Sequence, residues 1–217
     1  MQDADRFKAI RVKPSQARGK ERVRITLAAA LKVFQEQGFV SATTNDIAER
    51  AKIPIGSLYR YFPNKEALLL ALVDLYVTDV NDLFENIAKH PLFPVFSWNE
   101  LLLLTIDAWL HYMLLNGPFD FMYSAKANPE IGKLTRPSWL QQLTAFDALL
   151  RKRDSLLTGR QTLVAYRLAV AAVDLGSDIG FIKHAAAEPA AYYEAVQAVA
   201  LYVSSVSSIS STGNGAR

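Results

Sequence analysis

Between Thr43 and Lys65 the chain gathers hydroxyl, aromatic and basic side chains in two short segments separated by a tight turn. The turn is Lys52-Ile53-Pro54, and the second segment is Ile55-Gly56-Ser57-Leu58-Tyr59-Arg60-Tyr61-Phe62. This second segment carries more outward polar and aromatic groups than packing requires. Such groups hydrogen-bond phosphates and contact base edges, so the spacing predicts a helix-turn-helix that enters a DNA groove.

The residue patterns that catalysis or metal binding would need are missing from the sequence. The chain has no cysteine, which excludes disulfides and thiolate metal sites and is compatible with a reducing cytoplasm. The three histidines, His90, His111 and His184, are too far apart for paired metal ligation. The sequence has neither a nucleophile elbow nor a glycine-rich phosphate loop. We therefore expect no enzymatic activity, no cofactor and no metal.

The net charge of +3 is distributed unevenly along the 217 residues. Residues 1–65 contain 13 Lys+Arg and 6 Asp+Glu, whereas residues 66–217 contain 11 and 15. Either the first part is a basic solvated surface, or it contacts phosphates, and its coincidence with the predicted motif favours phosphates. The basic residues at the start of the chain could form a disordered tail, or an arm that follows the DNA backbone or enters a minor groove. They are Arg6, Lys8, Arg11, Lys13, Arg18, Lys20, Arg22 and Arg24.

Two helices are expected before the turn. Residues 16–37 predict an amphipathic helix that Gly38 ends in a left-handed conformation. Its apolar stripe consists of Leu27, Ala30, Leu31 and Phe34. At the start of the next helix, Thr43 and Asp46 have the spacing of a capping box, with Thr44 as the alternative cap.

Two more helices are expected after the turn. Pro54 suits the start of a helix over 55–62, because its missing N–H would have no partner there. The inward residues of this helix are Leu58 and Phe62. Asn64 then caps a fourth helix that runs toward Lys89.

The remainder of the chain also predicts helices. The segment Trp98 to Leu115 is apolar on nearly every side and indicates a buried helix. Further helices are expected over residues 137–153, 159–187 and 189–208. No segment alternates with period two, so the predicted fold class is all-α. We find neither a secretory signal nor a membrane span in the sequence and expect a cytoplasmic protein.

Residues Leu27 to Leu72 resemble the TetR family of bacterial transcription regulators. The matching stretches are Phe34-Gln35-Glu36-Gln37-Gly38-Phe39, Thr43-Thr44, Asp46-Ile47-Ala48, Ile55 to Phe62, and Asn64-Lys65-Glu66-Ala67-Leu68. Because several separated stretches match in order, the signal is more specific than a bare helix-turn-helix. The resemblance implies a basic arm over 1–15, a DNA-binding domain over 16–66, and a ligand-binding and dimerisation domain over 67–217.

The resemblance makes the helix over residues 55–62 the recognition helix. It implies that Gly56 lets the backbone approach the sugar-phosphate edge and that Ile55 contacts the groove floor. The hydroxyls of Ser57, Tyr59 and Tyr61 would reach phosphates, and the ring of Tyr59 would meet a thymine methyl. The alternative for the tyrosines is a place at the edge of the core.

Two residues beside this helix complete the implied interface. Thr44 and Lys65 resemble the family's phosphate-binding hydroxyl and lysine, although Thr44 could merely cap its helix and Lys65 could be solvated. Lys52 departs from the glycine that the family usually has in the turn. If this residue must take a positive φ, lysine costs about 1 kcal/mol relative to glycine.

Small residues recur at helical spacing in the last two predicted helices. They are Ala165, Ala169, Ala172, Gly176 and Gly180 in one helix, and Ala191, Ala195, Ala198, Tyr202 and Ser205 in the other. Such stripes permit close packing, either within one chain or between two chains. The resemblance favours a homodimer through a four-helix bundle, which would present two recognition helices about 34 Å apart to a palindromic operator.

The middle of the chain holds more aromatic residues than a small bundle needs. They are Trp98, Trp109, Tyr112, Phe119, Phe121, Tyr123, Trp139 and Phe146. Core packing is the default for each, but as a set they could line an apolar pocket whose polar groups are Asp107, His111 and Asn116. Asp107 and His111 share a helix face, which favours a structural hydrogen bond over a ligand contact. The resemblance implies a small-molecule inducer in this region.

Together these features predict a ligand-responsive DNA-binding regulator. Its most direct form is a repressor that a mostly apolar small molecule releases from a palindromic operator. Ligand binding would move the fourth helix and so change the separation of the two recognition helices. The alternatives are a DNA-binding dimer without an inducer, and a helical carrier of lipids or other small molecules.

Overall fold

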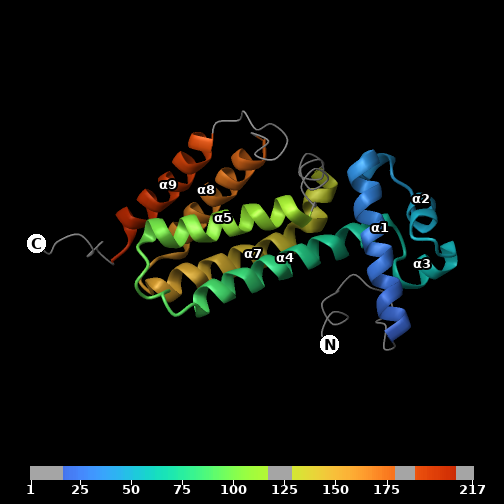
Figure 1. The fold of residues 1–217 in the computed structure, drawn as a ribbon, viewed down its shortest axis with the longest axis horizontal. Coiled ribbons are helices and arrows are strands. Elements are labelled where there is room, and N and C mark those ends of the chain that lie inside the picture. Colours follow the sequence, from blue (N-terminus) through green and yellow to red (C-terminus); the bar gives the residue numbers. More distant parts are fainter. Residues whose placement is uncertain (1–16, 117–128, 179–188, 209–217) are drawn as a thin grey trace, which may run out of the picture. The chain divides into compact units, whose positions relative to one another are not determined.

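The computed structural model describes residues 17–116, 129–178 and 189–208 (Figure 1). These residues form eight helices and no strand, which confirms the predicted all-α class. The helices are α1 (Ala17–Ser41), α2 (Thr44–Arg50), α3 (Ile55–Tyr61), α4 (Lys65–Lys89), α5 (Trp98–Asn116), α7 (Pro129–Arg153), α8 (Gly159–Asp178) and α9 (Pro189–Val206). Within these residues no helix is both long and apolar enough to span a bilayer.

The described residues fall into two compact units. The first comprises residues 17–79, 116 and 129–139, and the second comprises residues 80–115, 140–178 and 189–208. The division lies within α4 and again within α7, so both of these helices contribute to both units. The boundary expected at residue 66 lies near the start of α4 and stays a prediction.

The first unit contains the predicted helix-turn-helix. Within α1 the helical backbone is broken at Gly38, which has φ 75° and ψ 158°. The positive φ at this glycine was expected from the sequence. The capping box of α2 is also present, and it is built on Thr43. The Thr43 Oγ1 accepts the Asp46 N–H at 3.2 Å, while Asp46 Oδ2 accepts the Thr43 N–H at 3.0 Å.

The start of α7 belongs to the first unit and lies earlier than predicted. We expected a helix from Pro137, but α7 begins at Pro129 and includes Pro137. The contacts with α4 lie just after Pro137: the Ser138 hydroxyl donates to Asp74 Oδ1 at 2.6 Å, and the ring of Trp139 meets that of Tyr76 edge-on at 5.8 Å. The helix therefore starts at a different proline from the one expected, and Pro137 lies inside it.

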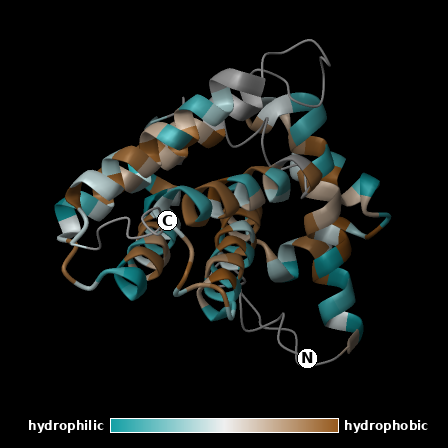
Figure 2. Cartoon of the chain, turned by 60° about the vertical axis from the view of Figure 1, so that its left-hand side comes forward, coloured by the Kyte–Doolittle hydropathy of each residue, from teal (hydrophilic) through white to brown (hydrophobic). Residues whose placement is uncertain are grey.

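An aromatic core holds the second unit together. Phe84 of α4 packs edge-to-face on Trp109 of α5 and on Phe146 of α7, with ring centroids 5.8 and 5.6 Å apart. Tyr166 of α8 lies 6.1 Å from Trp109 and 5.8 Å from Phe146. Figure 2 colours the helices by the hydropathy of each residue. Aromatic pairs of this kind add about 0.5–1.5 kcal/mol each beyond the area that they bury.

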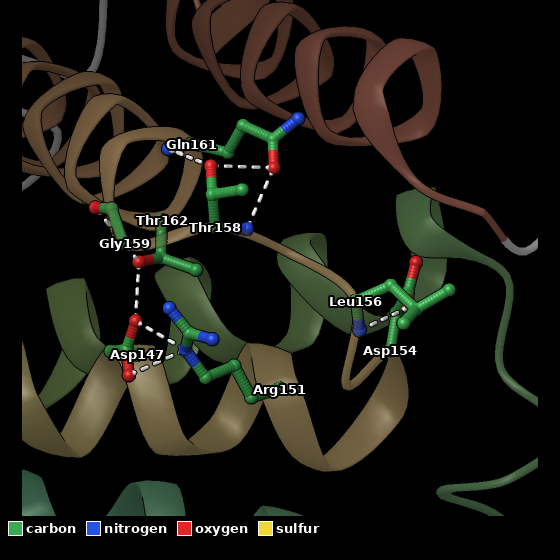
Figure 3. A network of polar contacts seen from close by, with 8 residues as sticks. All are labelled: Asp147, Arg151, Asp154, Leu156, Thr158, Gly159, Gln161 and Thr162. Atoms are coloured by element: carbon green, nitrogen blue, oxygen red, sulfur yellow. Dashed lines mark hydrogen bonds and ion pairs between the residues drawn. The ribbon is translucent and has the colours of Figure 1, made fainter.

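A polar network joins α7 to the start of α8 (Figure 3). Arg151 Nε donates to both oxygens of Asp147 at 2.9 Å, and the buried Thr162 hydroxyl donates to Asp147 as well. Thr158 begins α8 through a capping box with Gln161, whose Oε1 accepts the Thr158 N–H at 2.7 Å. These bonds set the direction in which α8 leaves α7.

The carboxylate of Asp154 holds the end of α9 against the end of α7. It accepts the Ser207 hydroxyl at 2.7 Å and the N–H and hydroxyl of Ser208 at 2.7 and 2.8 Å. The Leu156 N–H donates to it at 3.0 Å (Figure 3). Burial by itself raises the pKa of this carboxyl, but the hydrogen bonds outweigh burial and lower the pKa to about 2.

Candidate nucleic-acid interface

The helix α3 presents two contrasting faces. Leu58 and Phe62 are completely buried, as predicted, and Tyr61 is buried beside them with 7 % of its surface exposed. On the other face, Ile55 and Tyr59 are 37 % and 42 % exposed. Sequence reasoning placed the Tyr61 hydroxyl outward, but in the free chain this side chain belongs mainly to the core. The outward face therefore depends on Ile55, Tyr59 and their polar neighbours.

Gly56 has no internal structural reason to be glycine. A Cβ built on Gly56 meets no atom within 4 Å, its φ is not positive, and the residue is exposed. Glycine inside a helix costs about 1 kcal/mol relative to alanine. Glycine thus makes the free fold less stable at this position. Only the close approach of another molecule would require a residue without a side chain here.

The structure brings Thr44 of α2 and Tyr59 of α3 together. The Thr44 Oγ1 and the Tyr59 hydroxyl oxygen are 2.9 Å apart and hydrogen-bonded. Thr44 is half-buried, while Tyr59 is exposed. Two hydroxyls from two helices therefore share one surface location, where the hydroxyl that accepts the mutual bond can still donate to an anionic oxygen.

Lys65 lies at the start of α4 with its ammonium group turned toward the protein. Its Nζ donates to the carbonyl oxygens of Phe39, Val40 and Ala42 at 3.0, 2.8 and 3.1 Å. It also lies 4.8 Å from the centroid of the Phe39 ring. The expected phosphate contact of Lys65 stays a prediction, but in the free chain the three N–H donors of this ammonium are used internally.

The basic residues around α3 differ in their surroundings. Arg50 is paired with Glu36, with Nη1 2.7 Å from Oε1. Lys52 in the turn has φ 52°, which is the strained conformation that its replacement of a glycine predicted. Arg60 is exposed at the end of α3, 5.7 Å from the Tyr61 ring centroid. Sequence reasoning left Arg60 out, although its position between two tyrosines of the recognition segment could have indicated it.

A basic groove lies behind the turn, between the start of α1 and residues 51–53. Its volume is about 540 Å³, and its lining includes Arg18, Arg22 and Lys52. Arg24, two residues after Arg22 on α1, pairs with Glu21 at 2.6 Å. Lys20 also lies in α1 and is half-buried, whereas Arg6, Lys8, Arg11 and Lys13 lie outside the described residues.

Helices α8 and α9 pack side by side, and this packing uses part of the small-residue stripe. Ala165, Ala169 and Ala172 are completely buried within the single chain, so they fit the close-packing alternative rather than a face open to a second chain. Ala195 and Tyr202 are half-buried and Ala198 is exposed. Gly176 and Ala191 lie in helices without described surroundings, and Gly180 lies outside the described residues.

The outward surface of these two helices carries larger apolar residues. Leu163 and Leu168 of α8 are exposed, as are Tyr193 and Leu201 of α9, the last with 71 % of its surface accessible. On α9, residues 193, 197 and 201 follow one another at intervals of four and share one face. Sequence reasoning missed these exposed apolar residues, Leu163, Leu168, Tyr193 and Leu201, which accompany the small residues on the same two helices.

The predicted ligand residues fall into three groups. Trp98, Trp109 and Phe146 are buried in the second unit, where the last two belong to its aromatic core. Tyr112 is half-buried on α5. Three of them, Phe119, Phe121 and Tyr123, lie outside the described residues, and the side chain of Asn116 is not described.

A polar cluster lies on α5 beside α9. The His111 Nδ1 is 2.9 Å from the Asp107 carbonyl oxygen and 3.4 Å from its Oδ2, which is the within-helix contact that the spacing predicted. Tyr192 of α9 is completely buried. Burial and the neighbouring Asp107 carboxylate raise the pKa of the Tyr192 hydroxyl well above its usual value.

Comparison with known proteins connects the first unit to a family of regulators. The family described as "Bacterial regulatory proteins, tetR family" matches residues 27–72. The uncharacterised HTH-type transcriptional regulator YuxN of Bacillus subtilis is 42 % identical over 57 residues, which are 26 % of this chain and 20 % of YuxN. The HTH-type transcriptional repressor KstR of Mycolicibacterium smegmatis is 40 % identical over 57 residues, which are 26 % of this chain and 28 % of KstR. The matched region thus spans less than a third of either relative.

Similarity of fold extends over most of the chain. The crystal structure of the transcriptional regulator FadR from Bacillus subtilis in complex with stearoyl-CoA superposes with a TM-score of 0.60. The superposition covers 86 % of this chain and 98 % of FadR at 20 % sequence identity. At this identity the similarity concerns the fold alone. The matched sequences therefore relate the first unit to helix-turn-helix regulators, and the superposition supports the helical fold of the chain.

Proposed function

We propose that the chain, whose residues 27–72 match the tetR family of bacterial regulatory proteins, is a transcriptional regulator that represses by binding a palindromic operator. A small molecule bound by the helices beyond α3 would release it. The proposed function places the protein with the DNA in the cytoplasm. The alternative favoured by the buried aromatic core is a DNA-binding dimer that has no inducer.

The outward face of α3 is the observation that carries this proposal. It combines an exposed Ile55, an exposed Tyr59 and a Gly56 that the free fold does not require. The adjacent Ser57 is half-buried and Arg60 is exposed. A face of this composition supplies apolar contact, hydroxyl donors and positive charge together, which are the groups that a recognition helix brings to a major groove.

The hydroxyl pair of Thr44 and Tyr59 would bind one phosphate through whichever hydroxyl accepts their mutual bond. Their mutual hydrogen bond at 2.9 Å holds both oxygens near one point before DNA arrives. Ordering the pair in advance lowers the entropy lost on binding. Ile55 and Gly56 would then bring the start of α3 close to the bases, with Ser57 on the sugar-phosphate edge.

Selection of bound fragments from random duplex DNA tests the function, followed by affinity measurements against salt. We expect a palindromic consensus and a logarithm of affinity that falls linearly with the logarithm of salt concentration. Tyr59→Phe should weaken operator binding about tenfold in the dimer, whereas Tyr61→Phe should change it little because Tyr61 is buried. An absence of salt-dependent DNA binding by the intact chain would refute the proposal.

We place the dimer contact on the outward leucines of α8 and α9. The small residues first expected there are buried within one chain, whereas Leu163, Leu168 and Leu201 are exposed on neighbouring helices. In an isologous contact, each of the two copies would bury these side chains against the same surface of the other copy. Ala198, which is exposed on the same side of α9 as Leu201, would permit close approach.

We further propose that the inducer is mostly apolar. The fold neighbour FadR was crystallised with stearoyl-CoA, so a protein of this architecture can accept a long acyl chain. In the present chain, Trp98, Trp109 and Phe146 would offer apolar contacts, and Asp107 and His111 would offer polar ones. Because only three residues separate the end of α3 from the start of α4, a movement of α4 would reach the recognition helix directly.

Mutual weakening of inducer and operator tests the regulatory part. A thermal-shift screen of apolar and aromatic compounds, including acyl-CoA, should raise the melting temperature of the free protein. The selected compound should lower operator affinity by the same factor by which the operator lowers compound affinity. Independent binding of the two would leave the alternative of a regulator without an inducer.

A further inference from the structure

The ammonium group of Lys65 connects the start of α4 to the segment that leads into α2. Its three acceptors, the carbonyl oxygens of Phe39, Val40 and Ala42, lie 23 to 26 residues earlier in the sequence. Lys65 itself is half-buried. A long-range contact made by all three donors of one ammonium indicates a role inside the protein, and the inference drawn from it rests on the proposed function.

The carbonyls converge here because α1 ends in a separate short turn. Gly38 breaks the helix, and the Ala42 N–H bonds to the Gly38 carbonyl oxygen at 3.2 Å. The final carbonyls of a helical turn have no backbone donors of their own. A cation is favoured at such an end, and the face of the Phe39 ring, 4.8 Å away, adds to the attraction.

The held segment leads directly to the candidate DNA contact. Ala42 precedes Thr43, which caps α2, and Thr43 precedes Thr44, whose hydroxyl bonds to Tyr59. The position of the carbonyls therefore sets where α2 begins and where the Thr44–Tyr59 pair lies. Lys65, as part of α4, is a side chain through which a displacement of that helix would reach Thr44 of the pair.

We propose that Lys65 is a positioning residue for DNA binding, which orients the start of α2 through the carbonyls of residues 39–42 and does not neutralise a phosphate. An ammonium has three N–H donors, and here each has an acceptor at 2.8–3.1 Å. A direct phosphate contact would break at least one of these bonds. In this role Lys65 contributes geometry to the interface while its charge compensates the carbonyl dipoles.

Two substitutions separate positioning from phosphate contact. Lys65→Met removes the ammonium, whereas Lys65→Arg keeps the charge but replaces a compact donor with a planar fork that does not fit three converging carbonyls. We expect both variants to lower operator affinity by about tenfold or more, since both lose charged hydrogen bonds. Lys89→Met, at the far end of α4, removes the same charge and should retain the wild-type affinity.

The salt dependence of binding gives the decisive readout. Each lost phosphate contact lowers the slope of log affinity against log salt by about 0.9, which is about 1.8 for a dimer. Positioning by Lys65 predicts that Lys65→Met keeps the wild-type slope. The proposal is overturned if Lys65→Met reduces the slope by this amount, or if Lys65→Arg binds the operator as the wild type does.

A second measurement uses the free protein. Amide hydrogen exchange at residues 42–46 should accelerate in both Lys65 variants and stay unchanged in Lys89→Met. Since the chain has no cysteine, Lys65→Cys can be aminoethylated selectively, and the restored ammonium should return slow exchange and operator affinity together. Unchanged exchange in Lys65→Met would overturn the positioning role even if the intact protein proved not to bind DNA, which would by itself refute only the proposed function.

Discussion

The outward faces of α3 and of the α8–α9 pair both expose apolar or aromatic side chains, but the chemistry of the two faces differs. The α3 face mixes Tyr59 with Ile55 and with exposed Arg60 on a helix of seven residues. The α8–α9 face carries Leu163, Leu168 and Leu201 on helices of 20 and 18 residues. Donors and positive charge suit a polyanion, while an extended apolar surface suits another protein surface.

The two units also differ in how their helix ends are held. In the first unit a cation, Lys65, binds backbone carbonyls. In the second unit an anion, Asp154, binds hydroxyl and N–H donors at the end of α9. Acid protonates a carboxylate but leaves a lysine charged, so the second arrangement alone is sensitive to low pH. The chain thus uses opposite charges in its two units to hold the end of a helix.

The largest expected effect concerns the α8–α9 face. Leu201→Glu would bury a charge in the proposed dimer contact and should convert the protein to a monomer, as analytical ultracentrifugation would show. Operator affinity should then fall at least 100-fold, because two half-sites are no longer engaged together. Leu156→Glu is the matched control, since Leu156 is 74 % exposed outside this face. A dimeric Leu201→Glu variant would contradict the assignment of the face.

The next effect concerns the carboxylate of the second unit. Asp154→Asn should lower the free energy of unfolding by about 2 kcal/mol, measured by urea denaturation at pH 7, because the amide cannot accept all four bonds. The folded pKa of about 2 lies below the ordinary value of 3.8, so this stabilisation is complete above pH 4 and is lost as the pH falls toward 2. The variant should lose that part of the acid sensitivity. Glu85→Gln, in an exposed pair with Lys89, is the control.

A smaller and more specific effect concerns Gly56 on the α3 face. Gly56→Ala should raise the stability of the free protein by about 0.5–1 kcal/mol, since alanine is the better helix former and its Cβ meets no atom. The same methyl group should lower operator affinity about tenfold by preventing close approach of the backbone. A higher melting temperature in a thermal melt together with a lower operator affinity in a titration would show that Gly56 serves the interface and not the fold. Unchanged affinity would separate Gly56 from the DNA contact.

The smallest effect concerns the turn. Lys52→Gly should stabilise the protein by about 1 kcal/mol because residue 52 has φ 52°, a conformation that glycine adopts without strain. Chemical denaturation would measure the gain. Gly38→Ala is the counterpart, since Gly38 has φ 75° and alanine there should be destabilising. A destabilised Lys52→Gly variant would show that the lysine side chain contributes more than its backbone strain costs.

Local patterns allowed much of the first unit to be predicted from the sequence. The capping box of Thr43 and Asp46, the break at Gly38 and the inward positions of Leu58 and Phe62 all occur where the spacing placed them. Each of these features depends on groups within about four residues of one another. Such short separations are set by helix geometry, whatever the rest of the chain does.

Contacts between distant residues could not be derived in this way. The carbonyl partners of Lys65, the serines bound by Asp154 and the burial of Ala165 and Ala169 depend on which helix surfaces meet. The pattern of small residues permitted packing within one chain or between two, and only the folded arrangement of α8 and α9 distinguishes them. Sequence spacing reports which side of a helix is apolar or charged, whereas the partner of that side follows from the packing of the whole chain.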